Sequence, residues 1–392
     1  MRCLWITRQD PRPANSGELI YTLGLLESLA AQPRMEITVL GHKAAKSADG
    51  GPAVAWELHG NIPGGRLKSL LSALPGDAYR LGNPVQREAL AFLLGNKWDW
   101  VVIDQAACAW ALPMIPAAVK VAYLAHNHEA SVRKQVASDG GGSLPMRMAL
   151  KWDARKYARM ERVLARRADL ISAITPRDAA AFREENPGKP VCVLPPGYGG
   201  TAAPGPPREI TAETPRRVVL AGAFEWLAKR RNLETFLRAA EGPFQRAKIA
   251  FQVVGKADPA WFAALAKRYP WASFDANVPS VSPYLDQARV GLIPEALGGG
   301  FKLKALDYVF RGLPLASVEA ALSGVPVDPR TEAIAAPDPA SLAEAVAARI
   351  DDLEFLNHAA QRALEACRGA FRWADRGITL ARALENPEAF RC

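Results

Sequence analysis

The sequence predicts an α/β protein with two domains, each built on a parallel β-sheet that helices cover on both faces. Three observations predict this class. The chain has 392 residues, and domains of about 150 residues would make two or three of them. Short apolar runs rich in β-branched residues alternate with helical patterns, as parallel strands buried on both faces require. A stretch rich in Gly and Pro then separates two halves of the chain that repeat this alternation.

The first half opens with a strand, a loop and a helix. Residues 2–7 are the expected strand, residues 11–17 a loop rich in Pro, Ser and Gly, and residues 18–30 the helix. Further strands are expected at 36–40, 99–104, 119–125, 169–174 and 190–194. Residues 1–197 therefore make the predicted N-terminal domain.

The second half repeats the alternation after a predicted linker at residues 198–215. Residues 216–372 make the predicted C-terminal domain, with strands expected at 217–224, 248–256 and 290–294 and helices at 231–240 and 302–312. The last helical segment, 373–392, is a candidate to return to the first domain. The two domains are expected to face a cleft, since such sheets bind ligands at the carboxyl ends of their strands.

The composition is that of a globular protein. Hydrophobic residues make up 49% and charged residues 23%, which excludes disordered, collagen-like and coiled-coil proteins. The five cysteines are odd in number and far apart, so neither a disulfide framework nor a structural zinc site is expected. The first residues are too polar for a signal peptide, and no run of about 18 apolar residues predicts a transmembrane helix. A cytoplasmic protein is therefore expected.

A glycine-rich segment between a strand and a helix of the second half predicts an anion site. Gly298, Gly299 and Gly300 leave amides accessible at the start of the helix, where N–H groups and the helix dipole favour an anion. Lys302 and Lys304 add cationic donors nearby. The alternative is a glycine-rich connector with solvated lysines. The segment lacks the ending of a P-loop, and no G-x-G-x-x-G turn follows the first strand, which disfavours a dinucleotide-binding dehydrogenase.

Two further clusters lie at expected carboxyl ends of strands. Lys229, Arg230 and Arg231 are expected on a loop before a helix, facing the same cleft; a solvated basic turn is the alternative. His126 ends a buried-looking strand of the first half and is a candidate site residue. A hydrogen-bonded structural histidine is the alternative there.

A helix of the first half carries what we call the basic stripe. Its residues step by three or four positions and cover about 120° of the helix surface. They are Arg147, Lys151, Arg155, Arg159, Arg162 and Arg166. Leu150, Tyr157, Met160, Val163 and Leu164 are expected on the opposite side, packed on the domain. The stripe predicts either contact with anionic lipid headgroups or an ordinary solvated face. Nucleic acid ranks last, because no aromatic platform or nucleic-acid motif accompanies the stripe.

In their order and spacing, these segments resemble the retaining nucleotide-sugar glycosyltransferases of the GT-B fold, family-4 type. In the first half the likeness includes Ser16-Gly17 before a long helix, the turn Ala125-His126-Asn127, and Pro195-Pro196-Gly197. In the second half it includes Gly222 with Lys229, and the segment from Asp307 to Pro314. The likeness covers most of the chain and implies two Rossmann-like domains.

The resemblance implies roles for the matching residues. Lys229 would hold the donor diphosphate, and Asp307 would hold the ribose hydroxyls. His126 and Glu295 would face the donor sugar as catalytic residues. Gly222 belongs to the implied donor site, and Gly17 would let its loop approach the phosphates without a side-chain clash.

One departure from the family pattern concerns the spacing of two acids. Eleven residues separate Glu295 from Asp307, where the family commonly has seven. The chain therefore resembles a glycine–lysine variant, in which Lys302 or Lys304 would contact the diphosphate.

The implied function is transfer of a sugar from a nucleoside diphosphate sugar to an acceptor hydroxyl, with retention, in polysaccharide or glycolipid biosynthesis. Fixed cations suit this chemistry, because negative charge grows on the leaving diphosphate. No Asp-x-Asp motif appears, so no metal and no cofactor is expected. The expected partners are the nucleotide sugar, a lipid-linked or saccharide acceptor, and an anionic membrane surface on the inner face of the membrane.

Two other functions stay open at this point. A nucleotide-sugar 2-epimerase of the same fold would consume the donor without an acceptor. A non-catalytic protein that binds membranes or partners through the basic helix would have no affinity for nucleotide sugars.

Overall fold

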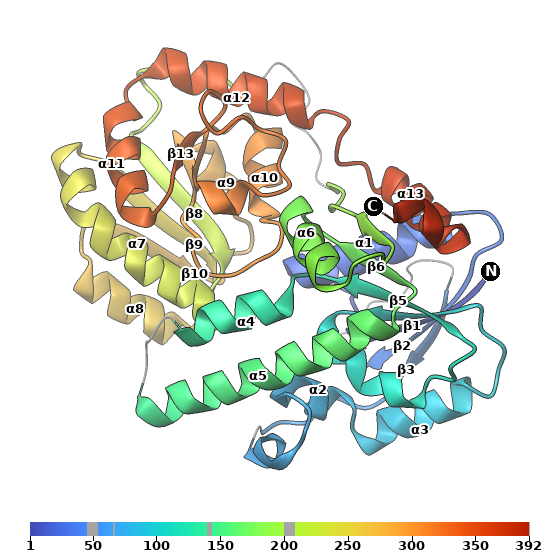
Figure 1. Ribbon diagram of the computed structural model, residues 1–392. Coiled ribbons are helices and arrows are strands. Elements are labelled where there is room, and N and C mark those ends of the chain that lie inside the picture. The colour runs from blue at the N-terminus through green and yellow to red at the C-terminus, as the bar shows by residue number, and fades with distance from the viewer. Residues whose placement is uncertain (45–53, 66, 139–142, 200–207, 392) are drawn as a thin grey trace. The chain divides into compact units, whose positions relative to one another are not determined.

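The computed structural model describes residues 1–44, 54–65, 67–138, 143–199 and 208–391, and it divides the chain into two units. The first unit is Met1–Gly197 together with Arg372–Cys392, and the second is Tyr198–Phe371. Each unit contains one sheet whose strands all pair in parallel (Figure 1).

The first unit has a seven-stranded sheet in the order β3-β2-β1-β4-β5-β6-β7. The strands are β1 (Arg2–Gln9), β2 (Glu36–His42), β3 (Ala55–Leu58), β4 (Trp100–Asp104), β5 (Lys120–Ala125), β6 (Leu170–Ala173) and β7 (Val191–Val193). The order reverses between β1 and β4, which pair from Cys3 opposite Trp100 to Ile6 opposite Ile103. β4 is wholly buried and β1 is buried from Cys3 to Thr7, as central strands of a sheet covered on both faces are.

Helices cover both faces of this sheet. They are α1 (Gly17–Ala30), α2 (Gly76–Leu81), α3 (Pro84–Leu93), α4 (Glu129–Ser138), α5 (Leu144–Arg167), α6 (Pro176–Glu185) and α13 (Trp373–Glu385), with short 3-10 turns η1 (Leu67–Leu71), η2 (Ala106–Met114) and η4 (Pro387–Phe390). None of the helices in the described parts of the chain is long and apolar enough to cross a membrane.

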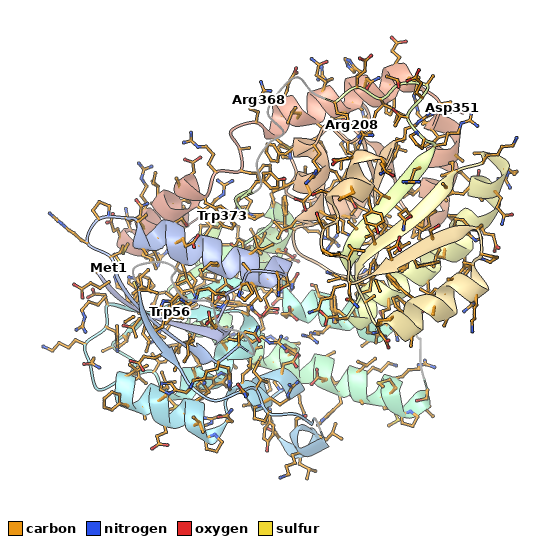
Figure 2. All side chains as sticks on the ribbon, turned by 180° about the vertical axis from the view of Figure 1, so that it is seen from behind. Met1, Trp56, Arg208, Asp351, Arg368 and Trp373 are labelled. Atoms are coloured by element: carbon orange, nitrogen blue, oxygen red, sulfur yellow. The ribbon has the colours of Figure 1, made fainter. Side chains whose placement is uncertain are left out.

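The C-terminal helix α13 packs on α1. The ring of Trp373, labelled in Figure 2, fills the space that a Cβ atom would take at Gly24 of α1 and at Gly197. The backbone of Ser28 similarly fills the space beside Gly377 of α13. Glycine is required at these close approaches, because any side chain would collide with its neighbour.

The second unit has a six-stranded sheet in the order β10-β9-β8-β11-β12-β13. The strands are β8 (Arg217–Ala223), β9 (Ala250–Lys256), β10 (Ala272–Ala276), β11 (Val290–Ile293), β12 (Leu315–Val318) and β13 (Ile334–Ala336). The helices are α7 (Leu227–Arg246), α8 (Pro259–Arg268), α9 (Ser282–Asp286), α10 (Lys304–Phe310), α11 (Pro339–Arg349) and α12 (Leu353–Cys367), with the 3-10 turn η3 (Glu319–Leu322). Here the order reverses between β8 and β11.

Two separate cores lie on the two faces of this sheet (Figure 1). Phe236 of α7 and Phe262 of α8 belong to one core, and Leu285 of α9 and Tyr308 of α10 belong to the other. Residues on β8 alternate between the cores, with Val218 in the first and Val219 in the second. The period of two along the strand therefore supplies both faces with apolar side chains.

The expectations for the predicted linker and for the cluster from Lys229 to Arg231 differ from the structure. Residues 208–215 of the predicted linker belong to the second unit, where Ile210 is buried and its backbone is hydrogen-bonded to Asn357. Residues 200–207 lie outside the described residues. The cluster from Lys229 to Arg231 lies in the first turns of α7 and not on a loop. Leu227 and Ala228 are good helix formers, so the helix begins before the basic residues.

Candidate functional site

The candidate site of the second unit lies at the carboxyl ends of β8 and β11, where the strand order reverses. Open α/β sheets bind ligands at such a point. Gly222 is near the end of β8, and a Cβ atom there would stand 3.6 Å from Nζ of Lys304. The carbonyl oxygen of Gly222 fills the position that a Cβ atom on Gly255 would need. Bare backbone and a lysine ammonium therefore share this edge of the sheet.

The glycine-rich loop, residues 294–303, joins β11 to α10. Gly298 and Gly300 have φ angles of 103° and 68°, which glycine adopts far more readily than other residues. Such angles do not belong to a right-handed helix. The helix begins at Lys304, two residues later than expected, and Phe301, Lys302 and Leu303 separate it from the three glycines.

Asn232 of α7 holds this loop through a reciprocal pair of hydrogen bonds. Its side-chain amide donates to the carbonyl of Leu297 at 2.8 Å, and the Leu297 N–H donates to its side-chain oxygen at 2.9 Å. Asn232 is itself buried. A buried amide that satisfies both backbone groups of one residue fixes the entrance to the three glycines.

Three lysines gather near Glu295 at this edge. Nζ of Lys304 donates to Oε1 of Glu295 at 2.5 Å, and Nζ of Lys302 donates to the carbonyl of Gly299 at 2.5 Å. Burial and the charge of Lys304 lower the pKa of Lys229 to about 8, although Glu295 opposes them. The three ammonium groups outnumber the carboxylates of Glu295 and of Glu225, which also acts on Lys229 through its charge.

Glu295 is buried, with 7% of its surface exposed. Burial favours its neutral form, but Lys304 and Lys302 outweigh burial and lower the pKa of Glu295. Among the described residues, no group hydrogen-bonds its second oxygen, Oε2. The carboxylate predicted to face a sugar is thus also the ion-pair partner of a lysine, and its second oxygen is a buried atom.

Asp307 lies one turn after Lys304 on α10 and is half-buried. Burial raises its pKa, while the neighbouring Tyr198 hydroxyl and the charge of Arg311 oppose that rise. The adjacent Tyr308 is fully buried; its hydroxyl accepts from the N–H of Ala221 at 3.0 Å. This hydrogen bond joins α10 to β8. The side chain of Asp307, one residue earlier, leaves the helix in a different direction.

The first unit has its own candidate site, at the carboxyl ends of β4 and β5. The imidazole of His126 and Oδ1 of Asp104 are 2.7 Å apart, and Oδ2 of Asp104 accepts from Thr22 at 2.8 Å and from Trp5 at 3.2 Å. Asp104 has no exposed surface. Burial lowers the pKa of His126, but Asp104 outweighs it and raises that pKa. A buried carboxylate thus orients the histidine and stabilises its charged form.

The structure brings the predicted residues together in two groups, one in each unit. In the second unit, Gly222, Lys229, Glu295, Lys302 and Lys304 lie at one sheet edge next to the three glycines, and Asp307 is one helical turn away. In the first unit, Gly17 is the exposed first residue of α1, and the charge of the next residue, Glu18, acts on His126.

Sequence reasoning missed Asp104, Asn232 and Tyr198. Asp104 could have been predicted from the sequence. It ends one expected strand and His126 follows the next, and the carboxyl ends of neighbouring parallel strands meet at one edge of the sheet. Asn232 and Tyr198 carried none, since their partners lie 65 and 109 positions further along the chain.

The basic stripe lies on the outer face of α5. Lys151, Arg155, Arg159, Arg162 and Arg166 are exposed, and Arg147 is half-buried. Tyr157, Met160 and Leu164 are buried against the unit as expected, and Leu150 is half-buried. The expectation for Val163 was wrong: it is 52% exposed, because its position on the helix turns it toward the stripe.

Comparisons with known proteins agree with this architecture. A family model described as a glycosyl transferase 4-like domain matches residues 16–197, and one described as glycosyl transferases group 1 matches residues 215–352. Together they cover well over half of the chain. The fold and these domains define a GT-B glycosyltransferase, so the predicted fold class is confirmed. The chain belongs to the glycosyltransferases that combine a family 4-like first domain with a group 1 second domain.

Solved structures share the fold at low sequence identity. Sucrose-phosphate synthase from Thermosynechococcus elongatus is 18% identical over 99% of both chains, with a TM-score of 0.73. WaaG, a glycosyltransferase involved in lipopolysaccharide biosynthesis, is 16% identical over 97% of this chain and 99% of its own, with a TM-score of 0.68. Anabaena HepE, solved with UDP and glucose, is 14% identical over 98% of this chain and 100% of its own, with a TM-score of 0.63. A search of curated protein sequences gives no match.

Proposed function

We propose that this glycosyltransferase moves a sugar from a nucleoside diphosphate sugar to an acceptor hydroxyl, with retention at the anomeric carbon. The observation that carries the proposal is the group of three lysines beside bare glycine backbone at the ends of β8 and β11. This surplus of positive charge suits a diphosphate. HepE, which shares the fold, has been solved with UDP and with UDP-glucose, so UDP is the first nucleotide to test.

The proposed chemistry assigns separate tasks to the residues of the site. The bond between the anomeric carbon and the diphosphate oxygen breaks, and the electron pair leaves with the diphosphate. Lys229, Lys302 and Lys304 stabilise this growing charge, and fixed cations do so without reorganising during the reaction. The amides of Gly298, Gly299 and Gly300 add donors to the same oxygens, and Gly222 keeps the strand end open.

Other residues would hold the rest of the donor. Asp307 would accept hydrogen bonds from the ribose hydroxyls. Oε2 of Glu295, which no described group hydrogen-bonds, would accept from a sugar hydroxyl, and His126, held by Asp104, would contact the sugar from the first unit. Gly17 would bring its loop close to the phosphates. No metal takes part in this scheme, so turnover is expected to survive EDTA.

The test of the donor site is a thermal-shift screen with UDP, UDP-glucose, GDP and ADP. A ligand that binds only the folded state raises the melting temperature by mass action. A charged hydrogen bond is worth about 1.5–3 kcal/mol. Lys229→Ala and Lys304→Ala should therefore each lower the affinity for the nucleotide that binds by roughly ten- to a hundredfold. Lys267→Ala, which removes an exposed lysine of α8, is the matched control and should bind normally.

Activity then separates the transferase from the alternatives. Release of the nucleoside diphosphate that depends on an added acceptor supports transfer. Donor consumption without any acceptor would support the epimerase instead. A folded protein that binds no nucleotide would overturn the proposal in favour of a non-catalytic role.

We also propose that the acceptor is a lipid-linked or saccharide intermediate and that α5 contacts the inner face of an anionic membrane. The exposed face of α5 carries large apolar residues among the basic stripe: Leu144, Met148, Trp152 and Val163 are all at least half exposed. Both acids of α5 are turned away, since Glu161 is buried and Asp153 accepts from the N–H of Gly76. A face with cations and apolar side chains but no acid suits a helix lying in the plane of a bilayer.

Vesicle flotation tests this contact. The protein should float with vesicles of phosphatidylcholine and phosphatidylglycerol, and much less with phosphatidylcholine alone, because each basic residue near an anionic surface contributes about 1 kcal/mol. Changing Lys151, Arg155 and Arg159 together to Gln should abolish flotation, and Trp152→Ser should weaken it. Phe92→Ser removes an even more exposed apolar residue from α3 and should leave flotation unchanged. Equal flotation on both kinds of vesicle, or none, would contradict the proposal.

A further inference from the structure

The turn at residues 126–128 is held at both ends by one carboxylate of α5. The turn links the end of β5 to the start of α4. Oε1 of Glu161 accepts from the hydroxyl of Tyr123, on β5, at 2.7 Å and from the N–H of Glu129 at 3.1 Å. Oε2 accepts from the N–H of Ala130 at 2.7 Å. Glu161 therefore bonds the strand before the turn and the first two residues of the helix after it.

Glu161 is a costly residue at this position. It has 2% of its surface exposed, and α4 and α5, which it joins, lie side by side in Figure 1. Burial raises the pKa of Glu161 to about 8, although the hydrogen bond from Tyr123 opposes the rise. An apolar side chain of similar volume would fill the space without this cost. Buried acids with shifted pKa values are frequent at functional sites, which points to a use for this one.

The position of the turn decides where the imidazole of His126 lies. Its Nε2 is 2.7 Å from Oδ1 of Asp104, and its ring meets that of Tyr21 edge-on, with centroids 5.0 Å apart. Glu18 of α1 and Glu129 of α4 act on the same imidazole through their charges. His126 follows β5 directly, and α4 begins three residues later. A shift of the start of α4 would therefore move the histidine off its carboxylate.

We propose that Glu161 is a positioning residue for His126: its carboxylate joins β5 to α4 across the turn and so keeps the imidazole on Asp104. The inference rests on the proposed function, in which His126 contacts the donor sugar. Hydrogen bonds that fix the turn before the donor binds reduce the entropy lost when the histidine and the sugar meet. The proposal assigns a role to a residue of α5 that lies away from the basic stripe.

The first measurement is the pKa of His126, by NMR of protein labelled at the ring carbons of its five histidines. His126→Gln assigns the signal. Asp104 raises this pKa in the unmodified protein. We expect Glu161→Gln to lower it toward the value of a free histidine, about 6.5, because the imidazole moves away from Asp104. The glutamine keeps the shape of the side chain, but its amide nitrogen is a donor that would face the N–H of Ala130 or of Glu129.

Tyr123→Phe is the variant that changes no charge. It keeps the ring, which meets Phe182 edge-on with centroids 5.7 Å apart, and removes only the hydroxyl that joins Glu161 to β5. A fall in the pKa of His126 then comes from its position and not from a lost carboxylate. We expect a fall in the same direction as in Glu161→Gln, but a smaller one. This variant also decides the matter if Glu161→Gln fails to fold.

Release of UDP from UDP-glucose, at saturating donor, is the second readout. Glu161→Gln should lower kcat about ten- to a hundredfold, because a misplacement of about 1 Å costs as much. Tyr123→Phe should lower kcat about fivefold, the cost of one hydrogen bond. The affinity for UDP, measured by calorimetry, should change less than twofold in both variants, because the lysines of the second unit are untouched.

Asp153→Asn is the matched control. Asp153 lies on the same helix, and its carboxylate accepts from the N–H of Gly76, the first residue of α2, at 2.8 Å. It therefore holds the start of a helix as Glu161 does, but not of the helix that follows His126. This variant should lower the melting temperature and leave both kcat and the pKa of His126 unchanged.

The outcomes separate positioning from a structural role and from the proposed function. A lower pKa of His126 in both Glu161→Gln and Tyr123→Phe, with kcat reduced and UDP affinity kept, supports the proposal. An unchanged pKa in both variants, or a fall only where the carboxylate is removed, would overturn it. An equal loss of kcat in Asp153→Asn would make Glu161 a purely structural residue. If the unmodified protein releases no UDP, the proposed function fails for this donor, and the pKa of His126 still decides whether Glu161 positions it.

Discussion

The two units place their candidate groups at the same kind of position but hold them in different ways. In the first, His126 is fixed by a fully buried carboxylate, Asp104, which already has donors from Thr22 and Trp5. In the second, lysines crowd together around one glutamate, and one of them has its pKa lowered to about 8. A compensated charge pair suits a group that must keep one orientation. An excess of like charge suits a site that an anionic ligand is to neutralise.

This difference predicts that a substitution in the candidate site of one unit impairs only the role of that site. Asp104→Asn should lower kcat by a factor of about 100 or more, because the charge and orientation of His126 depend on the carboxylate. Nucleotide affinity at the second unit should change less than twofold. Kinetics with isothermal titration separates the two effects, and Asp99→Asn, at an exposed acid before the same strand, is the control. Loss of nucleotide binding in Asp104→Asn would show that the units do not act separately.

The loop of the second unit can be loosened without touching its charges. Asn232→Ala removes both hydrogen bonds to Leu297 and should lower the affinity for UDP about tenfold. It should also lower the free energy of unfolding by about 1–3 kcal/mol. Asn357→Ala is a close control, because Asn357 makes the same reciprocal pair with Ile210 elsewhere in the unit. It should cost similar stability in chemical denaturation. If both variants lower the affinity for UDP equally, the loss of affinity follows from the lower stability of the unit and not from the position of the loop.

The smallest expected effect is on pH. Lys229 is protonated below its pKa of about 8 and loses its charge as the pH rises through that value. UDP affinity should therefore fall by roughly three- to tenfold between about pH 7 and pH 9.5, since one cationic contact is lost. Lys229→Arg keeps the charge over this range and should flatten the profile. A profile that is equally steep in the arginine variant would assign the titration to another group.

Local sequence patterns predicted the central strands of both sheets, the glycine-rich loop and most charged residues of the site, but they missed the strands β3, β10, β12 and β13. Buried strands such as Trp100–Asp104 are nearly continuous apolar runs. Gly298 was expected in a loop because glycine favours turns, and Lys304 was expected beside that loop because it follows closely in the sequence. What the sequence could not predict depends on pairing across the fold. Asn232 and Tyr198 look like ordinary polar residues until the chain brings Leu297 and Asp307 to them.

The return of α13 to the first unit has a consequence for how the protein is made. The first unit is encoded by two separate segments, whereas the second is one continuous stretch, Tyr198–Phe371. During synthesis from the N-terminus, all residues of the second unit emerge from the ribosome while the first still lacks its last helix. Until then α1 exposes the small-residue face that Trp373 later covers. The unit that begins the chain is therefore the last to complete its core.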